Sequence, residues 1–138
     1  MRSAMVSSSS PGARVLFRVL IVEDSKVLIE RLRESLATLE NVEVVGAVDE
    51  EAAAVEAVRS GEVDAIVLDL QLRTGTGFGV VQRLGTEERP TIIVFTNYVL
   101  PEYERRAKDL GIQYFLSKSA DYERLPQLLQ ELEQKKVA

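Results

Sequence analysis

Acidic, hydroxyl and basic side chains follow four apolar segments of this sequence, each at the point where its segment ends. Glu23 and Asp24 follow the first segment, Asp69 the third, Thr96 the fourth and Lys118 the fifth. Three carboxylates in one crevice repel one another unless a cation lies among them, and a lysine and a hydroxyl facing the same point make an anion site. An aspartate carboxylate can also attack phosphorus to form an acyl phosphate. These residue types predict phosphoryl transfer, which depends mainly on positioning and charge neutralisation.

The chain has no histidine and no cysteine among its 138 residues. Ser-His-Asp and Cys-His catalytic arrangements are therefore excluded, together with disulfides and with thiolate or histidine metal sites. A phosphohistidine cannot be carried by this chain either. Any metal ion would be bound by oxygen, which indicates magnesium, calcium or manganese, and Mg²⁺ accepts one or two carboxylates together with water and phosphate oxygens.

Composition also limits the partners of the chain. Its 17 Lys and Arg and 22 Asp and Glu give a formal charge of −5, which disfavours direct binding to nucleic acid because such binding depends on neutralising phosphates. No run of 18 apolar residues occurs, so no membrane insertion is expected. The apolar run 15–22 contains Arg18 and leads into acids, unlike a signal peptide. We therefore expect a cytoplasmic protein.

Hydrophobic patterning predicts a disordered tail over residues 1–14 and one domain over residues 15–138. The tail is rich in serine and closes with Pro11-Gly12, a composition that cannot bury apolar surface. Short β-branched and aliphatic runs predict strands over residues 17–22, 42–48, 63–68, 91–95 and 112–116. Helical spacing predicts five helices, which begin after Ser25, cover 50–59, end near Leu84, run from Pro101 to Leu110 before a stop at Gly111, and cover 121–136.

Five strands that alternate with five helices indicate the α/β class. Continuous apolar strands are typical of a parallel sheet covered by helices on both faces. In such sheets the functional residues lie at the carboxyl ends of the strands, near the point where the strand order reverses. This fold would therefore bring Glu23, Asp24, Asp69, Thr96 and Lys118 to one edge of the sheet, although they are far apart in the sequence.

Each of these residues also has a simpler interpretation when it is taken alone. Glu23 and Asp24 could form an ordinary turn between a strand and a helix, and Asp69 could cap a helix. Lys118 could be a solvated surface lysine, and Thr96 alone indicates almost nothing. The agreement of all four strand ends is what favours a common site.

The ordered motifs resemble those of bacterial response-regulator receiver domains, which have a doubly wound, flavodoxin-like fold with five parallel strands. The resemblance covers residues 17–136 and rests on four stretches: VLIVEDS (19–25), IVLDLQLRTGTG (66–77), VFTN (94–97) and YFLSKS (114–119). Gly77 lies eight residues after Asp69, and Phe115 lies three residues before Lys118. The set taken in order is more specific than any one of these motifs.

The resemblance implies a metal site. Asp24 would bind Mg²⁺ or Mn²⁺ directly, and Glu23 would act partly through water. Asp69 and the backbone carbonyl of Gln71 would complete the ligands that the protein supplies.

The resemblance also implies a phosphoryl site and a switch. Asp69 would accept a phosphoryl group from the phosphohistidine of a partner. Thr96 and Lys118 would bind the phosphoryl oxygens, and Phe115 would be the aromatic ring that rotates. A hydroxyl drawn towards the phosphate vacates space, the ring moves inward, and the face formed by the fourth helix, fifth strand and fifth helix changes.

Five positions depart from the family pattern or modify it. Ser119 stands where receiver domains usually have a proline, often in cis, and Arg73 stands where a proline is common after the acceptor. Asn97 follows the threonine, where a small residue is usual. Gln71 and Tyr98 occupy positions that influence hydrolysis of the acyl phosphate in the family. We expect the loop around Ser119 to have its own geometry and Asn97 to narrow access to the site.

The leading hypothesis is a single-domain response regulator. It would take its phosphoryl group from a sensor histidine kinase or a histidine phosphotransfer protein, and act on a downstream target protein or pass the group onward in a phosphorelay. It would catalyse its own phosphotransfer and slow dephosphorylation without being a conventional enzyme. A homodimer is possible through the face of the fourth helix.

Two other classes of function are compatible with parts of the pattern. One is a receiver-like protein-binding module that does not depend on phosphorylation. The other is a different chemistry on a similar scaffold. A phosphatase of the haloacid-dehalogenase kind needs a second aspartate where this chain has Gln71, and a flavin carrier is disfavoured because acids follow the first strand and would repel a phosphate.

Overall fold

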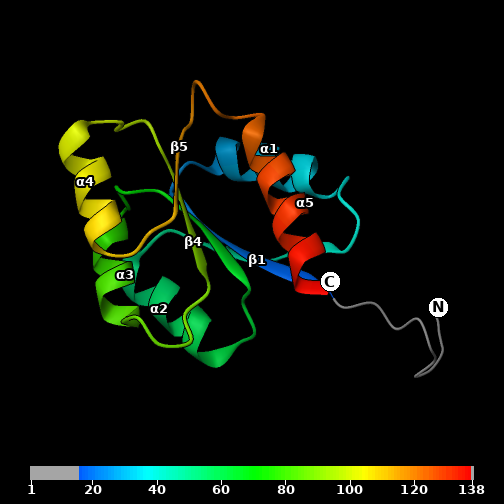
Figure 1. Cartoon of the computed structure of the whole chain (residues 1–138), viewed down its shortest axis with the longest axis horizontal. Coiled ribbons are helices and arrows are strands. Elements are labelled where there is room, and N and C mark those ends of the chain that lie inside the picture. The colour runs from blue at the N-terminus through cyan, green and yellow to red at the C-terminus, as the bar shows by residue number, and fades with distance from the viewer. Residues whose placement is uncertain (1–15, 138) are drawn as a thin grey trace.

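The computed structural model describes residues 16–137 as five strands and five helices in strict alternation (Figure 1). The predicted tail, residues 1–14, lies outside the described residues. The elements in chain order are β1 (Phe17–Val22), α1 (Lys26–Leu36), β2 (Val42–Val48), α2 (Glu51–Ser60), β3 (Ala65–Leu68), α3 (Gly77–Leu84), β4 (Thr91–Thr96), α4 (Pro101–Asp109), β5 (Tyr114–Ser117) and α5 (Arg124–Val137).

The five strands form one parallel sheet in the order β2-β1-β3-β4-β5. The chain therefore moves outward from β1 to β2, returns past β1 to β3 and continues to β5, so the direction of winding reverses between β1 and β3. Because this reversal separates the connections on the two sides, a crevice opens at the carboxyl ends of these two strands. The prediction of an α/β, flavodoxin-like, doubly wound sheet is confirmed.

Alternate residues of each strand build two separate cores, one on each face of the sheet. Leu20, Val22, Ile66 and Leu68 pack under α2, α3 and α4. Residues such as Ile21 pack on the other face, under α1 and α5. Figure 1 shows the two helix layers on opposite sides of the sheet. The strands are apolar on both faces because both faces are covered, as their continuous runs predicted.

Some predicted boundaries shift by a few residues for local reasons. The predicted stop at Gly111 is confirmed: its φ is +77°, and the amide of Ile112 donates to the carbonyl of Ala107, which closes the end of α4. Because Ile112 ends the helix, β5 begins only at Tyr114. The last helix begins at Arg124 instead of residue 121, since the residues before it form a turn.

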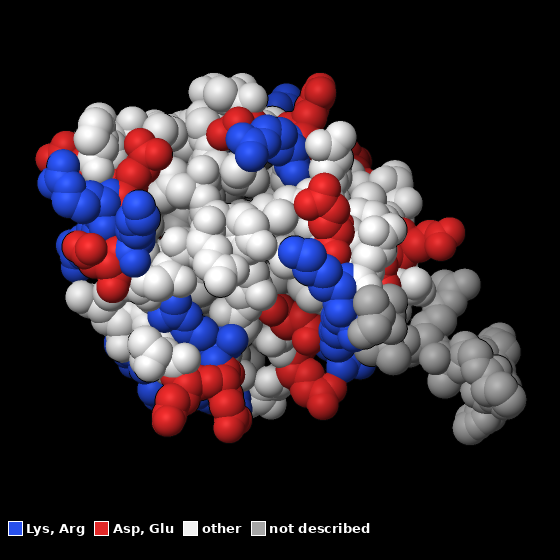
Figure 2. All heavy atoms as spheres, viewed as in Figure 1, with Lys and Arg blue, Asp and Glu red and all other residues white. Residues whose placement is uncertain are grey.

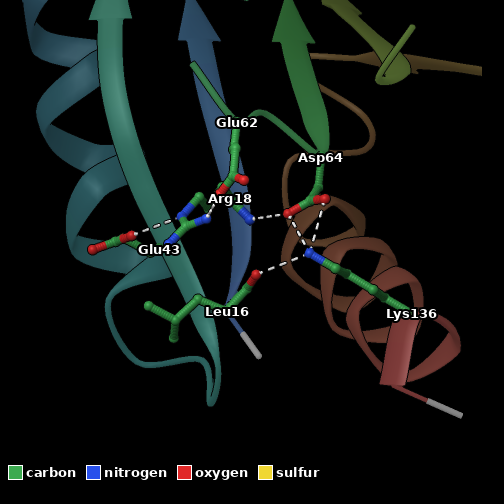
Figure 3. A network of polar contacts seen from close by, with 6 residues as sticks. All are labelled: Leu16, Arg18, Glu43, Glu62, Asp64 and Lys136. Carbon is green, nitrogen blue, oxygen red and sulfur yellow. Dashed lines mark hydrogen bonds and ion pairs between the residues drawn. The ribbon is translucent and has the colours of Figure 1, made fainter. Parts of the chain in front are cut away.

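A network of ion pairs joins the last helix to the start of the sheet, at the edge opposite the crevice (Figure 3). The ammonium of Lys136 lies 2.9 Å from each carboxylate oxygen of Asp64 and donates to the carbonyl of Leu16 at 3.2 Å. Asp64 also accepts from the backbone amide of Arg18 at 2.7 Å. The C-terminal turns of α5 are thus attached to the beginnings of β1 and β3.

No helix within residues 16–137 combines the length and the apolar character needed to cross a membrane.

Candidate functional site

The crevice between β1 and β3 brings three carboxylates together. One carboxylate oxygen from each of Glu23, Asp24 and Asp69 lies within 4.8 Å of the other two. The turn after β1 and the end of β3 are adjacent because the amide of Asp69 donates to the carbonyl of Val22 at 3.0 Å. Glu23 and Asp69 are only 3% and 6% exposed, whereas Asp24 is open to solvent. The cluster therefore has a buried floor and an accessible side.

Lys118, which follows the edge strand β5, supplies a positive charge to this cluster. Its ammonium lies 2.8 Å from Asp69 Oδ2 and 2.8 Å from Glu23 Oε1. The backbone of Lys118 is attached to β4, since its amide donates to the carbonyl of Thr96 at 3.0 Å. The long side chain thus reaches from β5 past β4 to the ends of β3 and β1. Three carboxylates and one ammonium leave the crevice with a net negative charge.

Burial and pairing act in opposite directions on the two best-buried charges. Burial raises the pKa of Glu23 above its ordinary value, although the hydrogen bonds from Lys118 and from the amide of Ser25 act to lower it. For Lys118, burial by itself lowers the pKa, but the hydrogen bonds and charges of Asp69 and Glu23 more than offset this and raise the pKa. The lysine is therefore held in its charged form by its two partners.

Within the crevice, each oxygen of the two buried carboxylates, Glu23 and Asp69, has a defined partner. Asp69 Oδ1 accepts from the amide of Leu70 at 2.7 Å, while Oδ2 accepts from Lys118. Glu23 Oε2 accepts from the amide of Ser25 at 2.9 Å. The Ser25 hydroxyl in turn accepts from the amide of Leu28 at 3.3 Å, which confirms the predicted N-cap of α1. These bonds fix the directions of both carboxylates before any ligand binds.

Thr96 and Phe115 lie beside the crevice on β4 and β5. Thr96 is fully buried at the end of β4, and its hydroxyl accepts from the amide of Tyr98 at 3.1 Å. The Tyr98 hydroxyl donates to Gln71 Oε1 at 2.8 Å, so the loops that follow β3 and β4 are joined above the site. Phe115 is half-buried and packs against the core under α2, α3 and α4. The hydroxyl of Thr96 thus bonds the next loop, and the ring of Phe115 lies on the α4 side.

A tight loop carries Gln71 away from Asp69. The amide of Gly77 donates to the carbonyl of Leu70 at 2.9 Å, and Gln71 pairs with Thr76 in an antiparallel bridge. A side chain at position 77 would overlap the carbonyl oxygen of Asp69. Only glycine allows this close approach, which explains why the loop returns so tightly beside the acceptor. We refer to residues 70–77 as the acceptor loop.

Side-chain bonds determine the course of the chain around Ser119, where the family has a proline. The amides of Ser119 and Ala120 donate to the Ser117 hydroxyl at 3.2 Å and 3.1 Å. Asp121 Oδ2 accepts from the amide of Ser117 at 2.8 Å. This bond, and then the pairing with Arg124, lowers the pKa of Asp121. A serine and an aspartate thus stabilise the turn that follows Lys118.

Arg73, within the acceptor loop, contacts two acidic residues that the sequence did not indicate as neighbours of the site. Arg73 donates from Nε to Asp49 Oδ2 at 2.9 Å, and its Nη2 lies 3.0 Å from Glu50 Oε2. The hydrogen bond from Arg73 lowers the pKa of Asp49. The sequence pattern that could have predicted this contact is the acidic run 49–51, which comes directly after the second strand. The basic partner of this run, Arg73, was noted in the sequence only as a departure from the family pattern.

The oxygen donors of the crevice are of the type that hard divalent cations prefer. Two of the carboxylates are buried and directed by hydrogen bonds, and the third faces solvent, so a cation with bound water could reach all three. Asp69 also supplies, at the floor of this crevice, the kind of carboxylate that can attack phosphorus. Carboxylates of the kind that bind cations and an ammonium of the kind that binds anions thus lie side by side in the crevice.

Comparison with known proteins agrees with this geometry. The family model described as the response regulator receiver domain matches residues 19–130. The transcriptional regulatory protein BtsR of Salmonella typhi is 31% identical over 124 residues, which cover 88% of this chain and 50% of that protein. The sensory transduction protein LytT of Bacillus anthracis is 27% identical over 121 residues, 88% of this chain and 49% of LytT. The chain thus spans about half the length of these curated relatives.

Solved structures show the same fold. A LuxR-family two-component response regulator from Aurantimonas superposes with a TM-score of 0.78 at 21% identity, over 87% of this chain and 86% of that one. The phosphorylated cyanobacterial phytochrome response regulator RcpA superposes with a TM-score of 0.72 at 26% identity, over 86% of this chain and 92% of RcpA. From the family match, the fold and the site together, the chain belongs to the response regulator receiver domains of two-component signal transduction.

Proposed function

We propose that Asp69 accepts a phosphoryl group from the phosphohistidine of a partner protein. The observation that carries this proposal is the Asp69 carboxylate, which is buried at the crevice, directed by the amide of Leu70 and paired with Lys118. These 138 residues contain no histidine, so they do not supply the phosphohistidine themselves. A carboxylate oxygen of Asp69 would form a bond to phosphorus while the bond between phosphorus and the histidine nitrogen breaks.

The cation that we assign to the site is Mg²⁺, or Mn²⁺ in its place. Glu23, Asp24, Asp69 and the backbone carbonyl of Gln71 would hold it, and the close approach of the three carboxylates supports this assignment. When bound, such a cation supplies positive charge that neutralises phosphoryl oxygens. Lys118 and the Thr96 hydroxyl would bind the remaining oxygens, with Lys118 exchanging a carboxylate partner for the phosphoryl group.

Thr96 and Phe115 would convert phosphorylation into a change of surface. To reach a phosphoryl oxygen, the Thr96 hydroxyl would give up its bond with the Tyr98 amide and vacate space beside β4. The half-buried ring of Phe115 would then move inward, and the face formed by α4, β5 and α5 would change. A phosphoryl dianion beside Lys118 provides the difference in interaction energy that drives this step.

The partners follow from this role. A sensor histidine kinase or a histidine phosphotransfer protein would donate the group, and a downstream protein would recognise the changed face or receive the group in turn. A homodimer through the α4 face is a further proposed output. Direct contact with nucleic acid is not part of the proposal: on the face seen in Figure 2, basic side chains lie next to acidic ones, and the chain is acidic overall.

The test is transfer of labelled phosphate from a small phosphodonor or a kinase in the presence of Mg²⁺. Wild-type protein is expected to become labelled, and Asp69→Asn is expected to lose the label because the amide is not a nucleophile. Asp109→Asn, which changes an exposed aspartate of α4, is the matched control and should label like wild type. Equal labelling of Asp69→Asn and wild type would show that the acceptor is another residue.

One observation favours a second candidate, a protein-binding module that does not depend on phosphorylation. Lys118 already pairs with both Glu23 and Asp69, so the protein itself neutralises part of the crevice. Amide NMR spectra with and without the phosphoryl mimic beryllofluoride distinguish the two. Shifts over α4, β5 and α5 support the phosphorylation switch, and an unchanged spectrum supports the module.

A further inference from the structure

The turn that joins β2 to α2, residues 48–51, touches both loops that carry the carboxylates. On one side the amide of Glu23 donates to the carbonyl of Val48 at 2.9 Å. On the other side the amide of Arg73, within the acceptor loop, donates to the carbonyl of Asp49 at 3.0 Å. The turn therefore bridges the two halves of the acidic cluster, one from β1 and one from β3.

The side chain of Arg73 makes this bridge a polar latch. Its guanidinium lies 2.9 Å from Asp49 Oδ2 through Nε and 3.0 Å from Glu50 Oε2 through Nη2. All three side chains are partly exposed, so the charges alone contribute little. A planar guanidinium that contacts two neighbouring carboxylates does, however, restrict the direction from which the loop arrives. We call Arg73, Asp49 and Glu50 the Arg73 latch.

Glu51 adds a second row of bonds to the same loop. Its amide donates to the carbonyl of Thr74 at 2.9 Å, and its carboxylate accepts from the amide of Thr76 at 3.0 Å. Gly75 has a φ of +87°, and a side chain there would lie 2.7 Å from Glu51 Oε1. The acceptor loop is thus attached at residues 73, 74 and 76 to the turn 48–51, beginning two residues after Gln71, whose carbonyl would bind a cation.

We propose that Arg73 is a positioning residue for the cation site, and that the latch holds the acceptor loop in the conformation that binds Mg²⁺. The inference rests on the Mg²⁺ site of the proposed function. The acceptor loop contains glycine and has few buried side chains, so without the latch it would sample more conformations. Ordering the loop would then have to accompany cation binding, which would weaken the affinity.

The first measurement is the affinity of the full chain for Mg²⁺ by isothermal titration calorimetry. Arg73→Ala is expected to weaken binding about two- to five-fold, the range for a partly exposed ion-pair network. Arg73→Lys keeps the charge but not the planar geometry, so its affinity for Mg²⁺ should lie between that of wild type and that of Arg73→Ala. Arg59→Ala is the matched control: Arg59 is an exposed arginine that joins α2 to α3 by bonding the Arg83 carbonyl, away from the acceptor loop, and its loss should leave the affinity unchanged.

The second measurement needs no metal. Amide hydrogen exchange, followed by NMR without divalent cations, should become faster in Arg73→Ala at the amides of Glu51, Arg73 and Gly77, whose bonds fix the loop. Asp49→Asn should have a similar but smaller effect. If the two residues act through their contact, the double variant will lose no more Mg²⁺ affinity than the worse single variant.

The outcomes separate this inference from the proposed function. Wild type that binds Mg²⁺ together with an Arg73→Ala that binds it equally well would overturn the latch and leave the proposed function intact. An equal loss in Arg73→Ala and Arg59→Ala would also overturn it, because the effect would be general destabilisation. Wild type that binds no Mg²⁺ would overturn both proposals.

Discussion

Lys118 places one ammonium between two buried carboxylates, and this arrangement ties the stability of the domain to the chemistry of its site. The ammonium lies 2.8 Å from both Glu23 and Asp69, and all three side chains are at most 14% exposed. Without the lysine the carboxylates would face each other in a poorly hydrated crevice. The residue that would bind a phosphoryl group therefore also stabilises the unphosphorylated fold.

Replacing Lys118 by methionine should destabilise the protein in the absence of divalent cations. The unfolding free energy is expected to fall by about 3–5 kcal/mol, because two buried carboxylates lose their shared partner. Urea denaturation in the presence of a chelator measures this change. Lys108→Met, at an exposed position of α4, is the control and should unfold like wild type. A Lys118→Met variant as stable as wild type would mean that the pairing contributes nothing to folding.

At the level of single residues, the sequence indicated which residue types form the site, but not which side chains form ion pairs with one another. Asp69 and Lys118 could be picked out because each follows an apolar strand. Their bond joins residues 49 positions apart, so no local pattern contains it. Arg73 was visible as an exception to the family pattern, but its carboxylate partner lies 24 positions earlier in the chain.

Among the elements, the start of α3 has the tightest packing against the acceptor. Gly77 begins the helix, donates to the carbonyl of Leu70 and lies so close to the Asp69 backbone that any side chain would overlap it. The same residue therefore sets the beginning of a helix and the shape of the acceptor loop. A change there should affect both the fold and the site.

Gly77→Ala is expected to lower the unfolding free energy by about 1–3 kcal/mol, the usual effect of overpacking a close contact. Gly61→Ala is the matched control. Gly61 also adjoins a helix, but its backbone is extended and an added side chain would have as its nearest neighbour the Ala57 carbonyl oxygen at 3.3 Å. Urea denaturation of the two variants compares them directly. If Gly77→Ala and Gly61→Ala unfold at the same urea concentration, the acceptor loop can shift to accommodate the added methyl group, and the close contact does not limit stability.

Element boundaries were predictable where local chemistry decides them. The bounds of β1 and β2 coincide with their apolar runs. Ser25 caps the start of α1 and Gly111 follows the end of α4, both as expected. The start of β5 was not predictable, because the amide of Ile112 is used to close α4 before the strand begins. An apolar residue can serve either element, and tertiary packing decides which one it joins.

For the whole molecule, the network in Figure 3 joins the two ends of the described chain. Lys136 of α5 bonds Asp64 before β3 and Leu16 before β1, on the edge of the sheet remote from the acidic cluster. The helix whose other end follows Lys118 is therefore anchored at the base of the sheet. The last turn of α5 is thus attached to the strands, whereas its first turn follows the loop that carries Lys118.

Lys136→Met should release the last turns of α5 and lower the unfolding free energy by about 0.5–1 kcal/mol, since the ion pair is partly exposed. Hydrogen exchange along α5 is expected to become faster near residue 136 and to stay unchanged near residue 125. Lys135→Met, at the neighbouring exposed position, is the control. Added salt should reduce the difference between Lys136→Met and wild type, and a difference that persists in high salt would point to lost packing as the cause.

The class of fold, the order of the elements and the residue types that end the strands could all be predicted from the sequence. These properties follow from periodicity and from turn chemistry, which act between residues close together in the chain. Tertiary structure alone decided which side chains pair: Lys118 with both Glu23 and Asp69, Arg73 with Asp49, and Lys136 with Asp64. The reason is that such pairs depend on the register and winding of the sheet, which bring distant residues within a few ångströms and are not written in any local pattern.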